Sequence, residues 1–436
     1  MSTEEKKTQV PMLRFPEFLE ADAWVKGKLI DTADRSIKWS FIGGPFGSNL
    51  KSSDYVETGV RIIQLQNIGD GEFFDDYRIF TTVGKADELR SNNIYPGEII
   101  MSKMGDPVGR ACLIPNLHDR YVMCSDGIRL VVNEKIHAKY FVYSLINSPR
   151  FRATVEKTAT GSTRKRIGLD ELKNLPMLLP TKGEQQKIAE CLSSLDELIV
   201  AQGRKVDALK THKKGLMQQL FPREGETQPR LRFPEFQNAE GWSSDALGNL
   251  FDTSSGGTPD RTKGEFWNGN VPWITTSLVG SSVIMYADEF ISDEGLKNSS
   301  AKVFPEKTIL MAMYGQGKTR GQVAMLGIKA ATNQACAAIL PRDEIDPLFV
   351  FLNLASRYEE LRGLSNSGGQ ENLSQGLIQG LQFSYPGDKA EQQRIGSCLS
   401  SLDALITAAT RELDVLKTHK KGLMQQLFPS AQAFEA

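Results

Sequence analysis

Two stretches of the chain carry hydrophobic residues at helical spacing over an unusual length. Apolar residues recur at steps of three and four between Glu184 and Pro222, and again between Glu391 and Pro429. The residues of this stripe are Ile188, Leu192, Leu195, Ile199, Val206, Leu209, Leu216, Leu220, Ile395, Leu399, Leu402, Ile406, Leu413, Leu416, Leu423 and Leu427. A repeat of seven with two apolar positions is typical of a coiled-coil seam. The pattern therefore predicts two helices of about 36 residues, each about 54 Å long.

The two stretches are copies of one another. Aligned at an offset of 207, they are identical at 29 of 39 positions, and both end in THKKGLMQQLFP. Proline cannot continue a helix, so the final Phe-Pro predicts where both helices end. Two unrelated core helices are the alternative, but helices longer than about 25 residues with a strict heptad usually form coiled coils. We expect the two copies to pack on each other as a rod.

A second repeat precedes each long helix. The sequence LRFPEF occupies Leu13–Phe18 and Leu231–Phe236, and Trp24 and Trp242 follow at the same distance. The chain thus reads tag, variable block and helix, twice over. We call LRFPEF the tag, and the repeated tag and long helix around each block the frame. The second tag directly follows the first helix. If the first tag meets the end of the second helix in the same way, it must pack near Phe428.

The two variable blocks, about 24–183 and 242–390, read as mixed α/β segments with many short strands. The predicted strands are Val60–Leu65, Glu98–Met101, Lys307–Met313 and Ala335–Leu340, and the predicted helices are Tyr140–Asn147 and Leu348–Ala355. The predicted regions are a first domain (1–183), a central helix (184–222), a second domain (223–390) and a C-terminal helix with a tail (391–436). Two similar frames that hold two divergent blocks suit a target with two different halves.

Composition narrows the class of protein. The 436 residues are 40% hydrophobic and 24% charged, as in ordinary soluble globular proteins. No apolar run of about 18 residues occurs, and the first ten residues lack an apolar signal core. The five cysteines form no CxxC and, with four histidines, no metal-ligand spacing, which favours a reducing cytoplasm. A net charge of −1 argues against a sequence-blind nucleic-acid coat protein but permits local basic faces.

One stretch resembles a catalytic motif. Ala312–Thr319 fits a loose phosphate-loop pattern, in which Lys318 would reach the terminal phosphates. The residues after it read as a strand rather than as the required helix, no convincing Walker B strand follows, and the equivalent turn GDPVGR in the first block lacks Gly-Lys-Thr. A hairpin tip is the better interpretation. Because no other catalytic constellation is evident, the sequence favours recognition or scaffolding over catalysis.

The turns of both blocks carry polar and basic side chains on glycine-flanked tips that can enter a DNA groove. In the first block the candidates are Ser48, Asn49, Lys51, Gln64, Gln66, Asn67, Lys103, Arg110, Arg164, Lys165 and Arg166. In the second block they are Thr258, Arg261, Lys263, Trp273, Thr275, Thr276, Gln316, Lys318, Arg320, Gln370 and Asn372. Any one of them is more often an ordinary solvated loop residue, so the sets are better supported than their members.

These features together resemble the specificity (S) subunits of type I restriction–modification enzymes, over nearly the whole chain. The motifs are LRFPEF before each block, GGPFGSNL and SDYVETGVRIIQLQNI in the first block, SGGTPDRTKGEFWNGNVPWITT in the second, EQQKIA and EQQRIG opening the helices, and GLMQQLFP closing them. The resemblance implies an α+β fold with two target recognition domains. Two long antiparallel coiled-coil helices would separate them, in a circular organisation with pseudo-two-fold symmetry.

The resemblance also implies a function. The chain would read a bipartite, asymmetric DNA site without catalysis of its own. It would bind two modification (M) methyltransferase subunits that use S-adenosylmethionine, and restriction (R) motor-nuclease subunits that use ATP and magnesium. A recognition subunit of a stand-alone methylation or phage-defence system, or a coiled-coil scaffold that binds no DNA, are the alternatives. The second block departs from the pattern at GGQENLSQGL, which lacks the basic cluster of GSTRKRIGLDEL in the first block.

Overall fold

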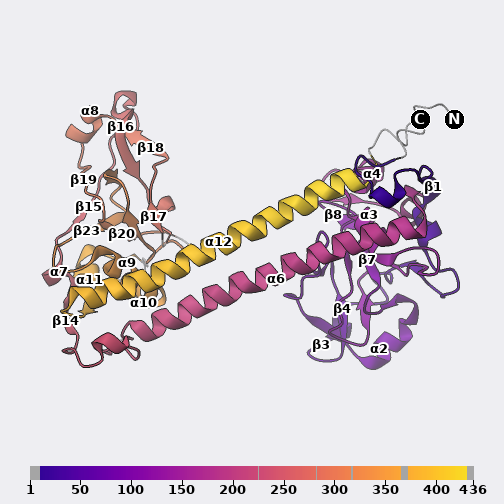
Figure 1. Ribbon diagram of the computed structural model, residues 1–436, viewed down its shortest axis with the longest axis horizontal. Helices are drawn as coiled ribbons and strands as arrows, with labels where there is room; N and C mark the ends of the chain where they lie inside the picture. The colour runs from indigo at the N-terminus through magenta and orange to yellow at the C-terminus, as the bar shows by residue number, and fades with distance from the viewer. Residues whose placement is uncertain (1–9, 224, 281, 316–317, 365–371, 430–436) are drawn as a thin grey trace. The chain divides into compact units, whose positions relative to one another are not determined.

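The computed structural model describes residues 10–223, 225–280, 282–315, 318–364 and 372–429. The chain forms two compact units: residues 1–202 with 412–436 make unit 1, and residues 203–411 make unit 2. Each long helix begins in one unit and ends in the other (Figure 1). Helices α6 (Lys182–Leu220) and α12 (Lys389–Leu427) have 39 residues each and end directly before Phe-Pro, as the sequence predicts.

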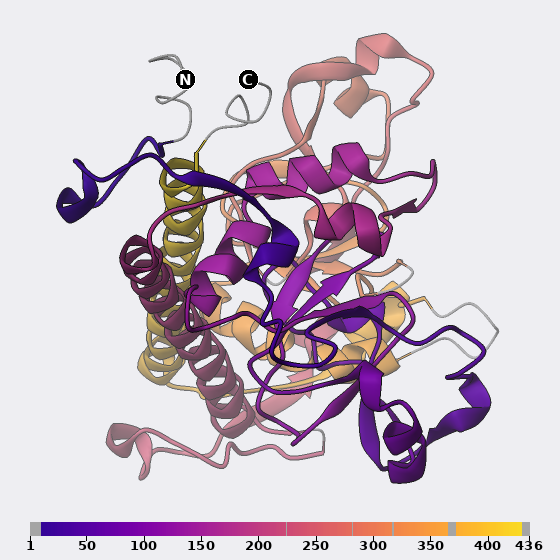
Figure 2. The ribbon, with the colours of Figure 1, turned by 90° about the vertical axis from the view of Figure 1, so that its right-hand side faces the viewer.

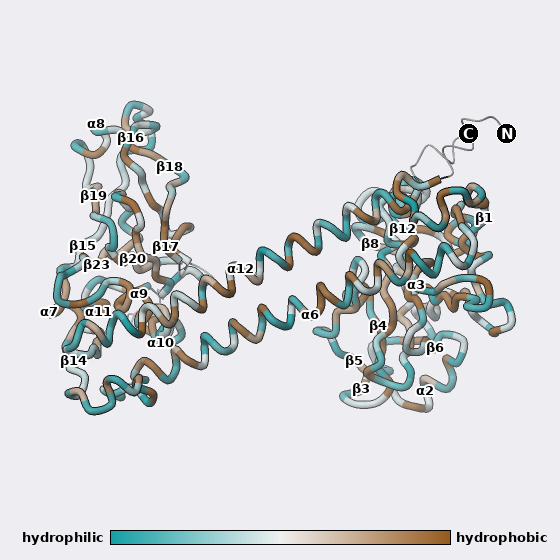
Figure 3. Tube along the Cα trace, in the orientation of Figure 1, coloured by the Kyte–Doolittle hydropathy of each residue, from teal (hydrophilic) through white to brown (hydrophobic). Residues whose placement is uncertain are grey.

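Within each unit, a segment of α6 lies beside a segment of α12 that runs in the opposite direction. The contacts between them are Asp196–Lys420 (2.5 Å) and Gln202–Glu412 (2.9 Å) in unit 1, and Lys213–Asp403 (2.6 Å) in unit 2. Hydrophobic positions recur along both helices (Figure 3), and all residues of the predicted apolar stripe are buried or half-buried. Charged pairs at the edge of such a stripe fix the register of two helices.

The first block folds into two main sheets in unit 1. Figure 2 shows the molecule with the strands of this block toward the viewer. One has the strand order β3-β5-β4-β10-β6 and the other β2-β11-β7-β9. Their strands are β2 (Phe41–Gly43), β3 (Tyr55–Val56), β4 (Val60–Ile63), β5 (Ile79–Thr81), β6 (Asn93–Ile94), β7 (Ile99–Ser102), β9 (Ala111–Leu113), β10 (Tyr121–Met123) and β11 (Gly127–Leu130). Two small sheets pair β1 (Val25–Lys28) with β13 (Pro176–Leu179) and β8 (Met104–Gly105) with β12 (Lys165–Arg166). The helices are α2 (Val83–Glu88), α3 (Lys139–Ile146), α4 (Pro149–Thr158) and α5 (Leu169–Lys173).

The second block, in unit 2, also has two main sheets. Their orders are β15-β23-β20-β21-β17 and β18-β16-β22-β19, and β14 (Ser243–Ala246) pairs with β24 (Gln382–Tyr385). The strands are β15 (Thr253–Ser255), β16 (Trp267–Ile274), β17 (Val283–Ile284), β18 (Glu289–Ile291), β19 (Val303–Phe304), β20 (Ile309–Ala312), β21 (Val323–Leu326), β22 (Ala330–Thr332) and β23 (Cys336–Ile339). The helices are α7 (Leu247–Leu250), α8 (Asp293–Lys297), α9 (Pro347–Ser356), α10 (Tyr358–Gly363) and α11 (Gln375–Gln379).

The two blocks share one plan, strand by strand. The series β2-β11-β7-β9 corresponds to β15-β23-β20-β21, with the same antiparallel neighbours. The turn after β7 has glycines with positive φ at Gly105 (146°) and Gly109 (73°), and the turn after β20 repeats them at Gly315 (143°) and Gly321 (80°). Glycine adopts such angles without steric cost, so these four positions define the shared turn. The predicted strands and helices of both blocks are confirmed within a few residues at their ends.

Each LRFPEF tag binds the end of the other copy's long helix. The Leu13 backbone N–H donates to the carbonyl of Gln426 (3.0 Å), and the Leu231 N–H donates to that of Gln219 (2.9 Å). In unit 1 the Trp24 ring also lies 6.4 Å from the Phe428 ring. The predicted packing of the first tag near Phe428 is thus confirmed.

A buried glutamate at the start of each long helix holds its tag. Glu184 is 1% exposed and accepts hydrogen bonds from Arg14 Nε (2.8 Å) and Nη2 (2.7 Å) and from the Trp24 indole (3.1 Å). Glu391 is fully buried and accepts the equivalent bonds from the guanidinium of Arg232 and the indole of Trp242. Bidentate pairs of this kind are strong and directional. The opening Glu of EQQ therefore anchors each frame.

The glutamine after each glutamate fixes the variable block to the helix. The Gln185 side chain accepts from the Ala138 N–H (3.1 Å), just before α3, and donates to the Pro180 carbonyl (2.9 Å). The Gln392 side chain accepts from the Asp346 N–H (2.7 Å), just before α9. Both glutamines are at most 1% exposed. The EQQ motif thus ties three segments of each unit together at the root of its long helix.

Candidate nucleic-acid interface

In the first domain, four loops meet at the turn Cys124–Gly127 between β10 and β11. Main-chain hydrogen bonds attach them: Gly44 N–H to Gly127 O (2.7 Å), Cys124 N–H to Ile63 O (2.9 Å), Lys103 N–H to Asp126 O (2.7 Å) and Ile167 N–H to Lys103 O (3.0 Å). A Cβ on Gly44 would lie 1.7 Å from the Cys124 carbonyl oxygen, so this approach requires glycine. Sequence segments that are far apart, each with predicted DNA-binding side chains, are thereby brought to one edge.

These loops present a mixed polar and basic surface. Ser48, Asn49, Lys51, Gln66 and Arg164 are exposed, and Gln64, Lys103, Arg110 and Lys165 are half-buried. Two cations of the basic cluster already have partners, because Arg166 pairs with Asp126 and Lys165 pairs with Glu156. The remaining groups supply donors and acceptors of the kinds that read base edges and bind phosphates.

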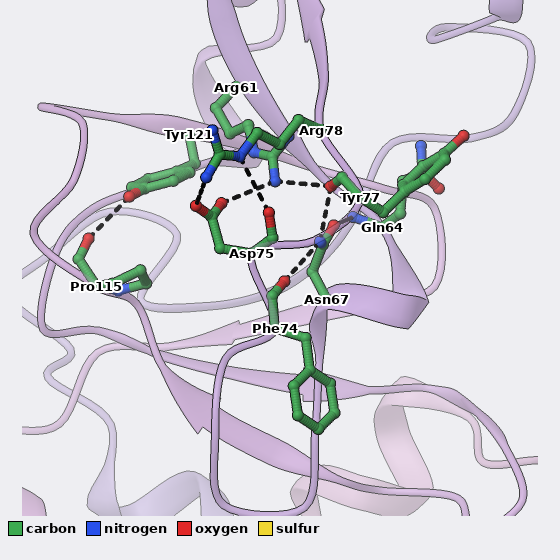
Figure 4. A network of polar contacts seen from close by, with 9 residues as sticks. All are labelled: Arg61, Gln64, Asn67, Phe74, Asp75, Tyr77, Arg78, Pro115 and Tyr121. Atoms are coloured by element: carbon green, nitrogen blue, oxygen red, sulfur yellow. Dashed lines mark hydrogen bonds and ion pairs between the residues drawn. The ribbon is translucent and has the colours of Figure 1, made fainter. Parts of the chain in front are cut away.

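A buried arginine network braces the loop that carries Gln64 and Gln66 (Figure 4). Arg61 is 1% exposed, and its Nη2 donates to the Tyr77 carbonyl (2.6 Å) and to the Asp75 carboxylate (3.1 Å). Burial lowers the pKa of Arg61 because desolvation disfavours its charge. The buried Arg61 guanidinium therefore holds the loop from inside, and Asp75 also pairs with the exposed Arg78 (2.6 Å).

Asn67 belongs to this brace and not to the exposed surface. It is fully buried, its amide donates to the carbonyls of Phe74 (2.8 Å) and Tyr77 (2.9 Å), and its oxygen accepts from the Gln64 N–H (2.9 Å). All these bonds are made within the loop. In this conformation Asn67 shapes the surface that Gln64 and Gln66 form and presents no group to a ligand.

The second domain repeats this arrangement at the turn Asn333–Cys336, between β22 and β23. The attaching bonds are Gly257 N–H to Thr332 O (2.8 Å), Asn333 N–H to Ile274 O (3.1 Å), Met313 N–H to Ala335 O (2.8 Å) and Leu373 N–H to Met313 O (3.0 Å). Gly256 takes the place of Gly44, since its Cβ would lie 1.9 Å from the Thr332 carbonyl oxygen. The same scaffold thus carries a different set of side chains.

The second-domain loops present fewer unpaired cations. Lys263 and Lys318 are exposed, Thr258, Thr275, Thr276 and Asn372 are half-buried, and Gln316 and Gln370 lie outside the described residues. Arg261 is exposed but binds both carboxylate oxygens of Glu289 (2.7 and 3.2 Å) and lies over the Trp267 ring (4.3 Å to its centroid). The Thr258 hydroxyl bonds to Gln334 of the central turn (2.5 Å).

Two further candidates of the second domain point inward. Trp273 is 2% exposed, and its indole donates to the Gly257 carbonyl (3.0 Å), which fixes the glycine loop. Arg320 is 8% exposed and donates to the Arg362 carbonyl (2.9 Å). Strand registers also show that Arg320 is not the counterpart of Arg110, because Met101 faces Ala111 where Met311 faces Val323. Both side chains are buried and hold backbone segments in place instead of lying on the exposed surface.

The phosphate-loop lookalike joins two antiparallel strands. Ile309–Ala312 pairs with Val323–Leu326 as neighbours in one sheet, so the stretch with Lys318 connects strands instead of opening a helix. Without the amino end of a helix, the backbone N–H groups that hold nucleotide phosphates are not gathered. The hairpin interpretation is confirmed.

We therefore expect that the purified chain neither binds nor hydrolyses ATP and that Lys318→Ala weakens recognition of one DNA half-site. Isothermal titration with ATP, with and without magnesium, measures the first, and binding to duplexes altered in one half measures the second. Saturable ATP binding that the substitution abolishes would contradict this prediction.

The cysteines and histidines form no site in the part of the chain that the structure describes. No group of three or more metal-binding side chains occurs there. Burial raises the pKa of Cys112 and of Cys336 to about 12, so neither thiol forms a nucleophilic thiolate readily. Among the described helices, none has the length and apolarity needed to cross a bilayer.

Sequence reasoning did not identify the two central turns. Ser125, Asp126 and Gln334 lie where the loops converge, yet their segments carry no motif or glycine cluster. The one indirect signal is the pair of Gly-Gly sequences at Gly43 and Gly256, which allow the backbone to approach the turns.

Comparisons with known proteins agree with this architecture. The family model described as the type I restriction modification DNA specificity domain matches residues 50–211 and 239–418. The EcoR124I/EcoR124II specificity subunit of Escherichia coli is 28% identical over 173 residues, which are 38% of this chain and 42% of that protein. The MjaIX specificity subunit of Methanocaldococcus jannaschii is 22% identical over 258 residues, 56% of this chain and 57% of that protein. The chain thus spans about half the length of these two relatives.

Other matches cover nearly the whole chain. The putative MjaX specificity subunit of the same archaeon is 21% identical over 379 residues, 85% of this chain and 86% of that protein. Among solved structures, the type I restriction-modification S subunit from M. genitalium has a TM-score of 0.58 and 17% identity, covering 97% of this chain and 99% of that one. A chain from a study of complex assembly in the type I R-M system also has a TM-score of 0.58, with 16% identity, covering 94% of this chain and 98% of that one. Since the family model matches most of both blocks and both long helices, the chain belongs to the family of type I restriction modification DNA specificity domains.

Proposed function

We propose that this chain is the DNA sequence-recognition subunit of a type I restriction–modification complex, and that each block reads one half of a bipartite, asymmetric site. The observation that carries the proposal is the repeated loop scaffold with different side chains. Loops held in fixed positions can place base-reading side chains at a defined depth in a DNA groove. Because these side chains differ between the two blocks, each block can read a different sequence. The half-buried and exposed candidates named above are proposed as the reading and phosphate-binding groups.

The frame supports a spacing role. We propose that α6 and α12 form an antiparallel coiled coil whose seam is the apolar stripe, with pseudo-two-fold symmetry between the halves. The crossed binding of each tag to the other helix copy, through Leu13 and Leu231, supports a circular organisation. In this proposal the coiled coil sets the distance between the half-sites, because two paired helices are stiffer than a single chain.

The chain itself is proposed to be non-catalytic. Two modification subunits bound to it would supply S-adenosylmethionine and the methyl transfer, and restriction subunits would supply ATP- and magnesium-dependent translocation and cleavage. The resemblance of the repeated frame to S subunits supports these partners, since two equivalent frames offer two equivalent docking surfaces.

Exchange of one block tests the proposal. Replacing residues 242–390 with the block of another family member is expected to change one half of the methylated motif and to leave the other half unchanged, because each domain closes its own core. Methylome sequencing of a host that carries the chain with its modification subunit measures both halves in a single experiment. The matched control replaces residues 24–183 instead and should change the opposite half. A simultaneous change in both halves would show that the domains do not read independently.

A further inference from the structure

The two blocks differ sharply in charge although the frames do not. Residues 24–183 contain 23 lysines and arginines against 18 aspartates and glutamates, a net charge of +5. Residues 242–390 contain 12 against 16, a net charge of −4. The near-neutral total of −1 for the whole chain conceals this difference. A polyanion therefore meets attraction at one domain and weak repulsion at the other.

The difference in charge between the two blocks is also present at equivalent positions of their loops. The hydrogen bond from Ile167 N–H to Lys103 O (3.0 Å) recurs as Leu373 N–H to Met313 O (3.0 Å), so Lys103 and Met313 occupy the same place. An ammonium group in the first domain is thus an uncharged thioether in the second.

The neighbouring position repeats the pattern. Arg166 directly precedes Ile167, and Asn372 directly precedes Leu373. Arg166 pairs with Asp126 of the central turn, whereas the equivalent turn position in the second domain is Ala335, which accepts from Met313 in the way that Asp126 accepts from Lys103. The second domain therefore has an amide and a methyl group where the first domain has an ion pair.

A cleft with basic side chains lies between the loops of the first domain and the end of α12. The cleft has a volume of about 530 Å³ and is lined by Arg152, Lys417, Lys420 and Lys421 and by a single carboxylate, Asp70. Other lining residues come from the 70–71 loop and from the turn at Pro107, which adjoin the reading loops. The Arg152 side chain is 12% exposed. Its Nη2 lies 3.6 Å from the Asp70 carboxylate, and its Nη1 is buried without a hydrogen-bond partner.

The same lysines recur in unit 2, whose block carries a net negative charge. Lys210 and Lys214 are the repeat counterparts of Lys417 and Lys421, at the offset of 207. All four are exposed. The clefts found in unit 2 around Arg357 contain Glu360 and no lysine of the long helix. The repeat therefore provides two identical lysine pairs in two different electrostatic settings.

We infer that the first domain, with the adjoining cleft at Lys417 and Lys421, holds the DNA phosphates and supplies most of the salt-dependent affinity, while the second domain reads its half-site mainly through hydrogen bonds and shape. This inference rests on the proposed DNA-binding function. Each phosphate neutralised by a lysine or arginine releases counterions, which steepens the fall of log K against log salt concentration by about 0.9. Groups that only hydrogen-bond to bases leave that slope unchanged.

The matched lysine pairs give the sharpest test. The chain in complex with its modification subunits is titrated with a duplex that carries its methylated motif, at several salt concentrations. Lys417→Gln with Lys421→Gln is expected to make the slope shallower by about 1 to 2. Lys210→Gln with Lys214→Gln removes the same charge from the same repeat positions and is expected to change the slope by less than about 0.5.

The interface residues give a second comparison. Lys103→Gln with Arg164→Gln is expected to make the slope shallower by about 1 to 2 and to weaken specific and non-specific binding alike. Lys263→Gln with Lys318→Gln is expected to reduce discrimination in one half-site with a smaller change in slope. Gel filtration and thermal melts verify that all four variants assemble. Equal slopes for the paired variants overturn the inference while the proposed function stands, whereas a wild-type complex without DNA binding overturns the function itself.

Discussion

Replacing Glu184 with alanine is expected to destabilise unit 1 by about 3–5 kcal/mol, because it leaves the Arg14 guanidinium buried without a counter-ion. The Arg14 side chain is 5% exposed, and the carboxylate also accepts the Trp24 indole N–H. Urea unfolding followed by tryptophan fluorescence and circular dichroism measures the loss. Glu391→Ala is expected to have a similar effect on unit 2, where Arg232 and the second tag lose the same anchor.

The control is Glu197→Ala, on an exposed position of the same helix. It removes the same side chain without a buried partner and should change stability by no more than about 0.5 kcal/mol. If the units unfold in separate transitions, each glutamate variant should move only its own transition. A loss below about 1 kcal/mol for Glu184→Ala would show that the buried pair is not the anchor of the tag.

Lengthening both long helices by one heptad is expected to widen the gap between the half-sites by about three base pairs. Seven residues add about 10.5 Å, and DNA advances about 3.4 Å per base pair. The insertions are placed between Gln202 and Lys213 in α6 and between Asp403 and Glu412 in α12, so that the contacts on either side are retained. A whole heptad preserves the apolar seam. The motif methylated in vivo, read genome-wide, gives the new gap.

Affinity should fall even at the new spacing, because three base pairs also rotate the duplex by roughly a quarter to a third of a turn. The control extends α6 alone, which shifts one side of the pair out of register and should abolish binding. An unchanged gap with full activity in the double insertion would mean that the helices are not the spacer.

The sequence was most informative where a pattern is local and repeated. The heptad and the Phe-Pro ending located both long helices, and β20 and β23 lie inside the segments predicted from Lys307 and Ala335. Such signals depend on side chains a few residues apart. The packing of the first tag near Phe428 followed from the order of the chain, since the second tag comes directly after the first long helix and the first tag was expected to complete the second frame in the same way.

The candidate site was predictable only as a set of loops. Its centre at Cys124–Gly127 is built by main-chain bonds between distant segments, such as Gly44 with Gly127, and these leave no local signature. Asn67 and Trp273 illustrate a second limit. An amide or an indole serves equally well to read a base or to brace a loop, and only the fold shows that these two side chains are buried.

The attachment of the reading loops by backbone hydrogen bonds has a consequence for evolution. The loops are positioned by backbone hydrogen bonds to the turns at Asp126 and Ala335. Exposed side chains such as Gln66 and Arg164 contribute little to these bonds. Substitutions at these exposed loop positions therefore change the stability of the fold little. Related proteins can thus come to recognise different DNA sites while they remain folded. Libraries randomised at these positions should yield mostly folded variants, and selection can then act on specificity alone.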